Sequence, residues 1–169
     1  STSLIADRGG IEANLDALVG DEADFFLTYA HPEVPFHLDR GQFSSLTVAH
    51  DRLIPLAAAQ VAMPGGMQPG LHMLDRAVAQ PRLAIPYLSY GFNSFFGVAL
   101  SRLMLRRPPF RRRTTHENTI SAGLMNMAVT GAGLCWLPES LAREEMEAGR
   151  LVPASQDEEV QIVTKRVVE

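Results

Sequence analysis

Apolar residues recur along the first half of the chain in short runs and at helical spacing. An apolar stripe predicts a helix over residues 11–19, which Gly20 ends. Apolar runs on either side of this helix predict strands at residues 2–6 and 24–29. Two strands joined by a helix predict a right-handed crossover in a parallel sheet.

Two extended segments follow this expected crossover. Residues 42–50 and 52–58 are rich in β-branched and apolar side chains, and His50 and Asp51 predict a tight bend between them. Residues 60–70 are rich in glycine and proline, which predicts a flexible surface loop.

Beyond this loop, helices and strands alternate regularly. Amphipathic stretches predict helices at residues 70–80, 92–105, 120–128 and 139–148. Apolar or half-polar runs predict strands at residues 82–88, 111–116, 134–138, 150–153 and 160–168. Gly131 and Gly149 are placed to end the third and fourth of these helices.

Strands that alternate with helices predict an α/β fold with a largely parallel sheet. Residues 59–150 can form one compact lobe, whereas residues 1–58 make a thin one. The apolar strand at the C-terminus has no helix after it, so we expect it to return to the first lobe. The first lobe would then comprise residues 1–58 plus 151–169, with a ligand cleft between the two lobes.

Composition narrows the class of protein. Apolar residues make up 46% and charged residues 20%, and no run approaches the roughly 18 apolar residues that span a bilayer, so we expect no membrane association. The single Cys135 excludes an internal disulfide and fits the cytoplasm. A formal charge of −4 argues against nucleic-acid binding by the chain itself. The run RRPPFRRR at residues 106–113 remains open between a solvated loop and an anion or nucleic-acid patch.

The sequence offers no catalytic constellation. Its histidines show no metal-ligand spacing; they are His31, His37, His50, His72 and His116. Hydrolase, dinucleotide and P-loop motifs do not occur, and Cys135 and Trp136 fall in an apolar strand typical of core packing. We therefore expect neither an enzyme nor a bound metal or cofactor.

Polar groups gather just past three expected strand ends, where open parallel sheets bind ligands. They are Ser89, Tyr90, Asn93 and Ser94 after one strand, His116, Glu117, Asn118 and Thr119 after the next, and Thr28, Tyr29 and His31 after the second strand of the chain. Helix N-termini follow the first two groups and favour an anion. Helix capping explains each group separately, but three groups at one sheet edge favour a ligand site in at least one of them.

Several stretches resemble the effector-binding domain of LysR-type transcriptional regulators. The stretch LDALVGDEADFFLTY is similar to an N-terminal part of that domain, and HENTISAGLMNMAVTGAGLCWLPESLAREEMEAGRLVP to its C-terminal signature. The stretch LSYGFNSFFGVALSRLM looks like the hypochlorite-responsive branch. The resemblance implies a type 2 periplasmic-binding-protein-like fold of two α/β lobes with a cleft for a small-molecule or anion effector. It also implies a homodimer or tetramer in the cytoplasm.

On matching positions, the resemblance assigns the turns at residues 7–10, 89–94 and 116–119 to the cleft, which adds Gly9 to the candidate residues. The family's winged helix-turn-helix, its linker helix and the first strand and helix of the first lobe have no counterpart in these residues. We therefore expect promoter DNA to be bound only through a missing N-terminal domain. A periplasmic-type solute-binding protein of the same fold is the alternative.

The sensed signal has two candidates. One is reversible binding of an anion or small acid at Ser89, Asn93 and His116. The other is oxidation of methionine, because Met63, Met67 and Met73 cluster in and beside the Gly/Pro-rich loop, where exposure would permit sulfoxide formation. The resemblance also implies that the helix after WLP lies at a dimer interface.

Overall fold

The computed structural model describes residues 1–7, 9–34, 42–156 and 160–168, which form two compact units. Unit 1 comprises Ser1–His50 and Ile162–Glu169, and unit 2 comprises Asp51–Gln161. Sequence placed these boundaries after residue 58 and before residue 151. The difference arises because residues 53–58 and 151–153 pair with each other and with further strands inside unit 2.

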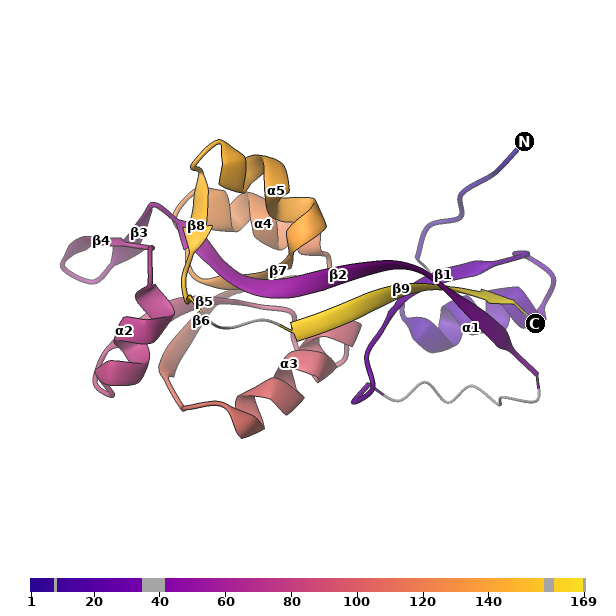
Figure 1. Ribbon diagram of the computed structural model, residues 1–169, viewed down its shortest axis with the longest axis horizontal. Coiled ribbons are helices and arrows are strands. Elements are labelled where there is room, and N and C mark those ends of the chain that lie inside the picture. The colour runs from indigo at the N-terminus through magenta and orange to yellow at the C-terminus, as the bar shows by residue number, and fades with distance from the viewer. Residues whose placement is uncertain (8, 35–41, 157–159, 169) are drawn as a thin grey trace. The chain divides into compact units, whose positions relative to one another are not determined.

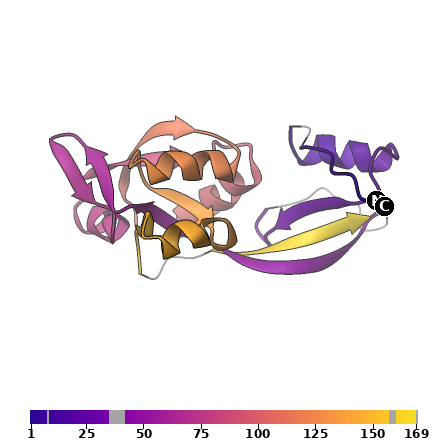
Figure 2. The ribbon, with the colours of Figure 1, turned by 90° about the horizontal axis from the view of Figure 1, so that it is seen from above.

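Unit 1 is a small α/β unit. Helix α1 (Ile11–Val19) lies on one face of strand β1 (Phe26–Ala30) and of the outer parts of β2 (Ser44–Ala58) and β9 (Val160–Val168) (Figure 2). The apolar stripe buries Ala17 and Leu18 and confirms the predicted helix.

Two predictions for unit 1 are wrong. Residues 2–6 form no strand, and Leu4 is 89% exposed. The strand β1 pairs antiparallel with β9, with Phe26 opposite Val167. No parallel crossover is therefore built around α1, because β1 takes a partner from the C-terminus instead of the N-terminal segment.

Strand β2 is continuous, so the predicted bend at His50 and Asp51 is wrong. Its last residues pair antiparallel with β7 (Cys135–Pro138) and with β8 (Leu151–Pro153). These ladders enclose Leu53 and Leu56, which are fully buried. His50 and Asp51 fit within this extended strand because their side chains are not placed in the core. His50 is exposed, and the half-buried Asp51 accepts hydrogen bonds from Ser140.

The parallel pairing found among the described residues lies in unit 2. Strand β5 (Ala84–Ser89) runs parallel to β6 (Arg111–Glu117), and Tyr87 forms a parallel bridge with Leu134. The other described ladders between named strands are antiparallel, so the expectation of a largely parallel sheet is corrected to a mixed one.

The predicted loop at residues 60–70 is instead a hairpin. Strands β3 (Gln60–Met63) and β4 (Gly66–Pro69) pair antiparallel around a two-residue turn. The two turn residues are Pro64 and Gly65, and the second position requires the positive φ that Gly65 supplies (89°).

Four helices complete unit 2 close to their predicted positions: α2 (Met73–Ala79), α3 (Phe95–Arg106), α4 (Ser121–Val129) and α5 (Glu139–Glu147). Helices α4 and α5 lie on one side of the strands, and α2 and α3 lie on the other (Figure 1). The core between them includes Trp136, Leu137 and Leu124, all fully buried. Among the described residues, no helix is both long and apolar enough to cross a membrane.

Candidate functional site

The parallel pair β5–β6 brings two of the predicted turns together in unit 2. Ser89 ends β5 opposite Glu117 at the end of β6. The backbone N–H of Asn118 donates to the carbonyl oxygen of Ser89 at 3.0 Å, which ties the start of one turn to the start of the other. The site consists of these paired turns, residues 89–94 and 116–120.

The β5–α3 turn is shaped by its own serines. Ser89 Oγ accepts a hydrogen bond from the N–H of Gly91 at 2.9 Å, and Gly91 has a φ of 76° that favours glycine. Ser94 is the N-cap of α3: its Oγ accepts from Gly97 N–H and donates to the carbonyl of Tyr90, both at 3.0 Å. Ser94 therefore performs the capping role that was the alternative to ligand contact.

Tyr90 belongs to the interior of unit 2. Its side chain is 1% exposed, and its hydroxyl donates to the carbonyl oxygen of Trp136 at 2.7 Å. Ser121 Oγ lies 3.2 Å from the same hydroxyl, and the ring packs edge-on against Phe96. The hydroxyl joins the turn to β7 and α4 and does not face a ligand.

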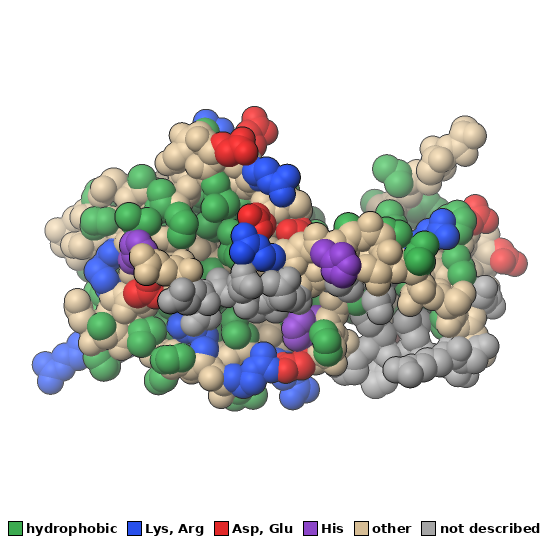
Figure 3. Space-filling model, in the orientation of Figure 1, with side chains coloured by type: hydrophobic (Ala, Val, Ile, Leu, Met, Phe, Trp, Pro, Cys, Tyr) green, Lys and Arg blue, Asp and Glu red, His purple; other side chains and the backbone are tan. Residues whose placement is uncertain are grey.

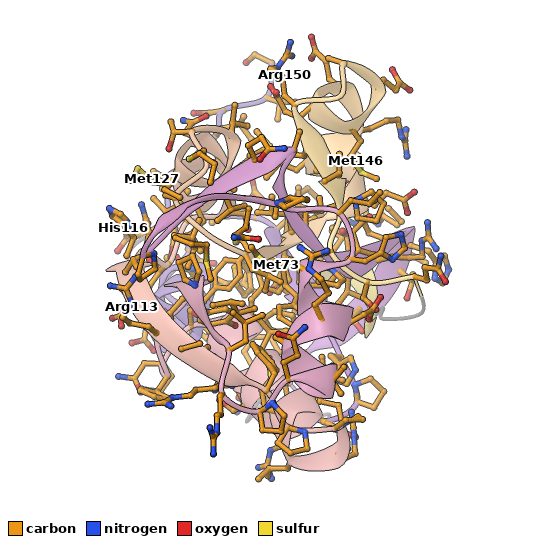
Figure 4. All side chains as sticks on the ribbon, turned by 90° about the vertical axis from the view of Figure 1, so that its left-hand side faces the viewer. Met73, Arg113, His116, Met127, Met146 and Arg150 are labelled. Carbon is orange, nitrogen blue, oxygen red and sulfur yellow. The ribbon has the colours of Figure 1, made fainter. Side chains whose placement is uncertain are left out.

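Three of the predicted polar residues remain at the surface. Asn93 is exposed and makes no side-chain hydrogen bond with the described residues. His116 is exposed on β6, at the same margin of unit 2 as Arg113 (Figure 4). Asn118 is exposed as a residue, but its Oδ1 accepts from the N–H of Ile120 at 2.9 Å and its Nδ2 lies against Gly123 in the first turn of α4.

Helix α4 begins at this site without a side-chain cap, since its N-cap position is Ile120. The first N–H groups of an uncapped helix are donors that favour negative charge. Ile120 is 64% exposed and Phe92, in the β5–α3 turn, is 82% exposed. Helical spacing had placed both side chains on the apolar faces of the helices expected at residues 92–105 and 120–128. They lie instead in the turns before α3 and α4, which begin at Phe95 and Ser121.

The other two candidates, Gly9 and Thr28, belong to unit 1. The N–H groups of Gly9 and Gly10 donate to Asp7 Oδ1 at 3.1 and 3.2 Å, and Asn14 Nδ2 donates to the same oxygen at 2.7 Å. These hydrogen bonds, that of Asn14 first, lower the pKa of Asp7. The carboxylate of Asp7 thus already pairs with the N–H groups of the turn before α1, and Thr28 Oγ1 donates to the carbonyl of Tyr29.

The arginine run after α3 is partly used in packing. Arg112 lies over the rings of Tyr87 (5.2 Å) and Phe110 (5.4 Å), and Arg107 lies 5.0 Å from the centre of Phe110. On the face shown in Figure 3, basic and acidic side chains lie beside one another and form no continuous basic patch. Neither feature favours a nucleic-acid surface.

Cysteine and histidine chemistry is equally limited in the described part of the chain. Cys135 is fully buried, and burial raises the pKa of its thiol, so the reactive thiolate is disfavoured. No group of three His, Cys, Asp or Glu side chains is arranged to hold a metal among the described residues. His37 lies outside the described residues. A shallow depression is lined by Gln80, Pro81, Arg82 and Leu83, none of which is a candidate residue.

No family model matches the chain. Over 81 residues, 48% of this chain, it is 34% identical to the HTH-type transcriptional regulator YjiE of Escherichia coli K12. Over 148 residues, 88% of this chain, it is 26% identical to the HTH domain-truncated transcriptional regulator QseD of Escherichia coli O157:H7. These matches span 26% and 55% of the length of the two relatives.

Solved structures share the fold. The regulatory domain of HypT from Salmonella typhimurium matches 94% of this chain and 69% of its own, with a TM-score of 0.73 and 24% identity. VV2_1132, a LysR family transcriptional regulator, matches 99% of this chain and 51% of its own, with a TM-score of 0.74 and 24% identity. The chain therefore has the two-lobe fold of the regulatory domains of LysR-type transcriptional regulators and is similar in sequence to bacterial transcription regulators.

Proposed function

We propose that the chain is the effector-sensing regulatory domain of a LysR-type transcriptional regulator. The observation that carries this proposal is the match of nearly the whole chain to such regulatory domains. The similarity to two transcription regulators points the same way and favours a role without catalysis. Nothing in the comparisons favours the alternative of a solute-binding protein.

The effector is a small molecule with an acidic group, bound at the paired turns of unit 2. Asn93 and His116 are exposed there, the hydroxyl of Ser89 can donate outward, and the first N–H groups of α4 carry no side-chain cap. These donors suit a carboxylate, because a negative group gains both hydrogen bonds and the favourable end of the helix dipole.

As a LysR-type regulator, the protein would have two further partners, promoter DNA and a second copy of itself. Promoter DNA would be bound by a winged helix-turn-helix outside these 169 residues, and a second copy of the chain would form a homodimer or tetramer in the cytoplasm. A related protein, DarR of Vibrio fischeri, was solved in complex with DNA, and LysG of Corynebacterium glutamicum with bound effector Arg. Effector binding would alter how such subunits present their DNA-binding parts.

Thermal-shift titration tests the effector site. A small carboxylic acid that binds the folded chain should stabilise it by about 2.7 kcal/mol at a hundredfold excess over its dissociation constant. The variants Asn93→Ala and His116→Ala should lose most of this stabilisation, whereas Asn126→Ala, on the exposed side of α4, should keep it. Equal stabilisation of all three variants would place the acid elsewhere.

Methionine oxidation is the second candidate signal. Met67 on β4 is 56% exposed, while Met73 is 2% exposed and lies inside unit 2 (Figure 4). HypT, whose regulatory domain has the same fold, is described as hypochlorite-specific. Mass spectrometry after mild hypochlorite treatment should find sulfoxide at Met67 before Met73. If Met67→Leu leaves a hypochlorite response of the complete regulator unchanged, oxidation at this hairpin is not the signal.

A further inference from the structure

A carboxylate lies inside the proposed effector site. Glu117, the last residue of β6, is exposed, and its side chain makes no hydrogen bond or ion pair with the described residues. Its side chain lies against the backbone of Gly91 in the neighbouring turn. A Cβ atom at Gly91 would stand 3.1 Å from Glu117 Oε1 and 3.3 Å from its carboxyl carbon.

This carboxylate lies in the turn that leads into α4, four residues before Ser121, where the N–H groups proposed to bind an acid begin. The carbonyl oxygen of Gly91 packs against Gly97 in the first turn of α3, so closely that a side chain at Gly97 would clash with it. Gly91 thus contacts the start of α3 on one side and Glu117 on the other. An acid held by the first N–H groups of α4 would meet a second negative charge at Glu117, and like charges repel.

No cation offsets this charge within the described residues. The arginines of β6 lie at its opposite end, and Arg112 is held over the rings of Tyr87 and Phe110. A ligand that brings its own positive charge would replace the repulsion with a charge-assisted hydrogen bond to Glu117.

We propose that the effector is a zwitterion with adjoining ammonium and carboxylate groups, as in an α-amino acid. This inference rests on the proposed function, since it uses the same pair of turns. The carboxylate binds the backbone donors and Asn93, and the ammonium group donates to Glu117. Phe92 and Ile120, both largely exposed in these turns, offer apolar contact to the ligand's side chain. An apolar or aromatic amino acid therefore fits the site better than a bare acid or a halide.

Matched probes can test this charge pattern by calorimetric titration of the whole chain. L-phenylalanine is compared with 3-phenylpropionate, which lacks the amine, and with 2-phenylethylamine, which lacks the acid. L-leucine is compared with 4-methylpentanoate and 3-methylbutylamine. At least one amino acid should bind about tenfold or more tightly than either of its partial analogues, because a hydrogen bond to a charged group contributes that much.

The variant Glu117→Gln separates charge from shape. It should weaken binding of the amino acid about tenfold and tighten binding of the corresponding simple acid. The matched control Glu147→Gln, an exposed acid near the end of α5, should change neither affinity.

Three results would overturn the inference. Simple acids that bind the natural chain as tightly as the amino acids would refute the zwitterion and leave the effector site standing. An unchanged preference in Glu117→Gln would do the same. If none of the six probes binds, the inference is rejected. If Asn93→Ala and His116→Ala also leave unchanged the thermal shift that any carboxylic acid produces, the proposed site is rejected as well.

Discussion

Gly91 is the residue whose backbone most constrains the candidate site. Its φ of 76° disfavours any side chain, and a Cβ would also press on the Glu117 carboxylate at 3.1 Å. Gly149 offers a matched comparison, since its φ is 74° but nothing lies within 4 Å of its Cβ position. Gly149→Ala should cost about 1–2 kcal/mol from backbone strain, and Gly91→Ala should cost more. Equal losses in urea denaturation would mean that Glu117 moves aside freely.

Asp7 makes the stability of unit 1 depend on pH. Its pKa is lowered in the folded chain by hydrogen bonds from Asn14, Gly10 and Gly9, so its contribution is present above the unfolded pKa near 4. As pH falls through the folded pKa, the carboxylate is protonated and that contribution is lost. Because its hydrogen bonds are exposed to solvent, Asp7→Ala should cost about 1 kcal/mol or less at neutral pH. In acid-denaturation curves the difference from the natural chain should shrink as pH falls below the unfolded pKa and through the lowered folded pKa. A difference that persists there would assign the effect to packing.

At the scale of elements, helix α5 is capped by a side chain from strand β2. It begins after Pro138 without a side-chain cap from that position, and Asp51 on β2 accepts from Ser140 N–H at 3.2 Å and from the Ser140 hydroxyl. Asp51→Ala should destabilise unit 2 by about 1 kcal/mol in urea titration. Glu139→Ala, which breaks an exposed pair with Arg52 at 2.6 Å, should cost less than about 1 kcal/mol. The reverse order would show that the ion pair, not the cap, fixes this helix.

The sequence predicted helices well, because their apolar spacing is local. It predicted strands and bends less well, because these depend on pairing with distant parts of the chain. Helix α1 and helices α2 to α5 follow apolar spacing that is local to the chain. Residues 2–6 have the composition of a strand, yet a strand requires a partner, and none pairs with them among the described residues. The polar pair His50 and Asp51 suggested a turn, whereas the long ladder of β2 keeps it extended. Long-range pairing of this kind leaves no local trace.

At the candidate site, too, sequence predicted one feature and missed others. Sequence predicted that the segments after β5 and β6 meet, because neighbouring parallel strands end at one edge. It could not assign the hydroxyl of Tyr90 to the carbonyl of Trp136, since that hydrogen bond joins residues 46 positions apart. Sequence also could not predict that Glu117 lies against Gly91, because this contact depends on the positive φ angle of Gly91. A glycine allows such an angle but does not require it.

At the scale of the whole molecule, the two units differ in how much core they hold. Among the described residues, unit 1 buries only a few large apolar side chains, such as Leu18 and Ile162, whereas unit 2 buries Trp136, Leu53 and many others. Small units bury a smaller fraction of their surface and are marginally stable. Hydrogen exchange measured by mass spectrometry should therefore show α1 and β1 opening before α4 and β7. Simultaneous opening of all four would mean that the units unfold as one cooperative block.

The burial of Trp136 also determines which optical signal reports on which unit. It is the only tryptophan of the chain, fully buried in unit 2 beside the rings of Tyr87 and Phe110. Its fluorescence follows unit 2 and is insensitive to unit 1, whereas far-ultraviolet dichroism records both. The only thiol, Cys135, occupies the preceding position and is equally buried, so a thiol reagent will react when unit 2 opens. The natural chain thus carries two intrinsic reporters of one unit, and an unfolding step of unit 1 would be detected by dichroism alone.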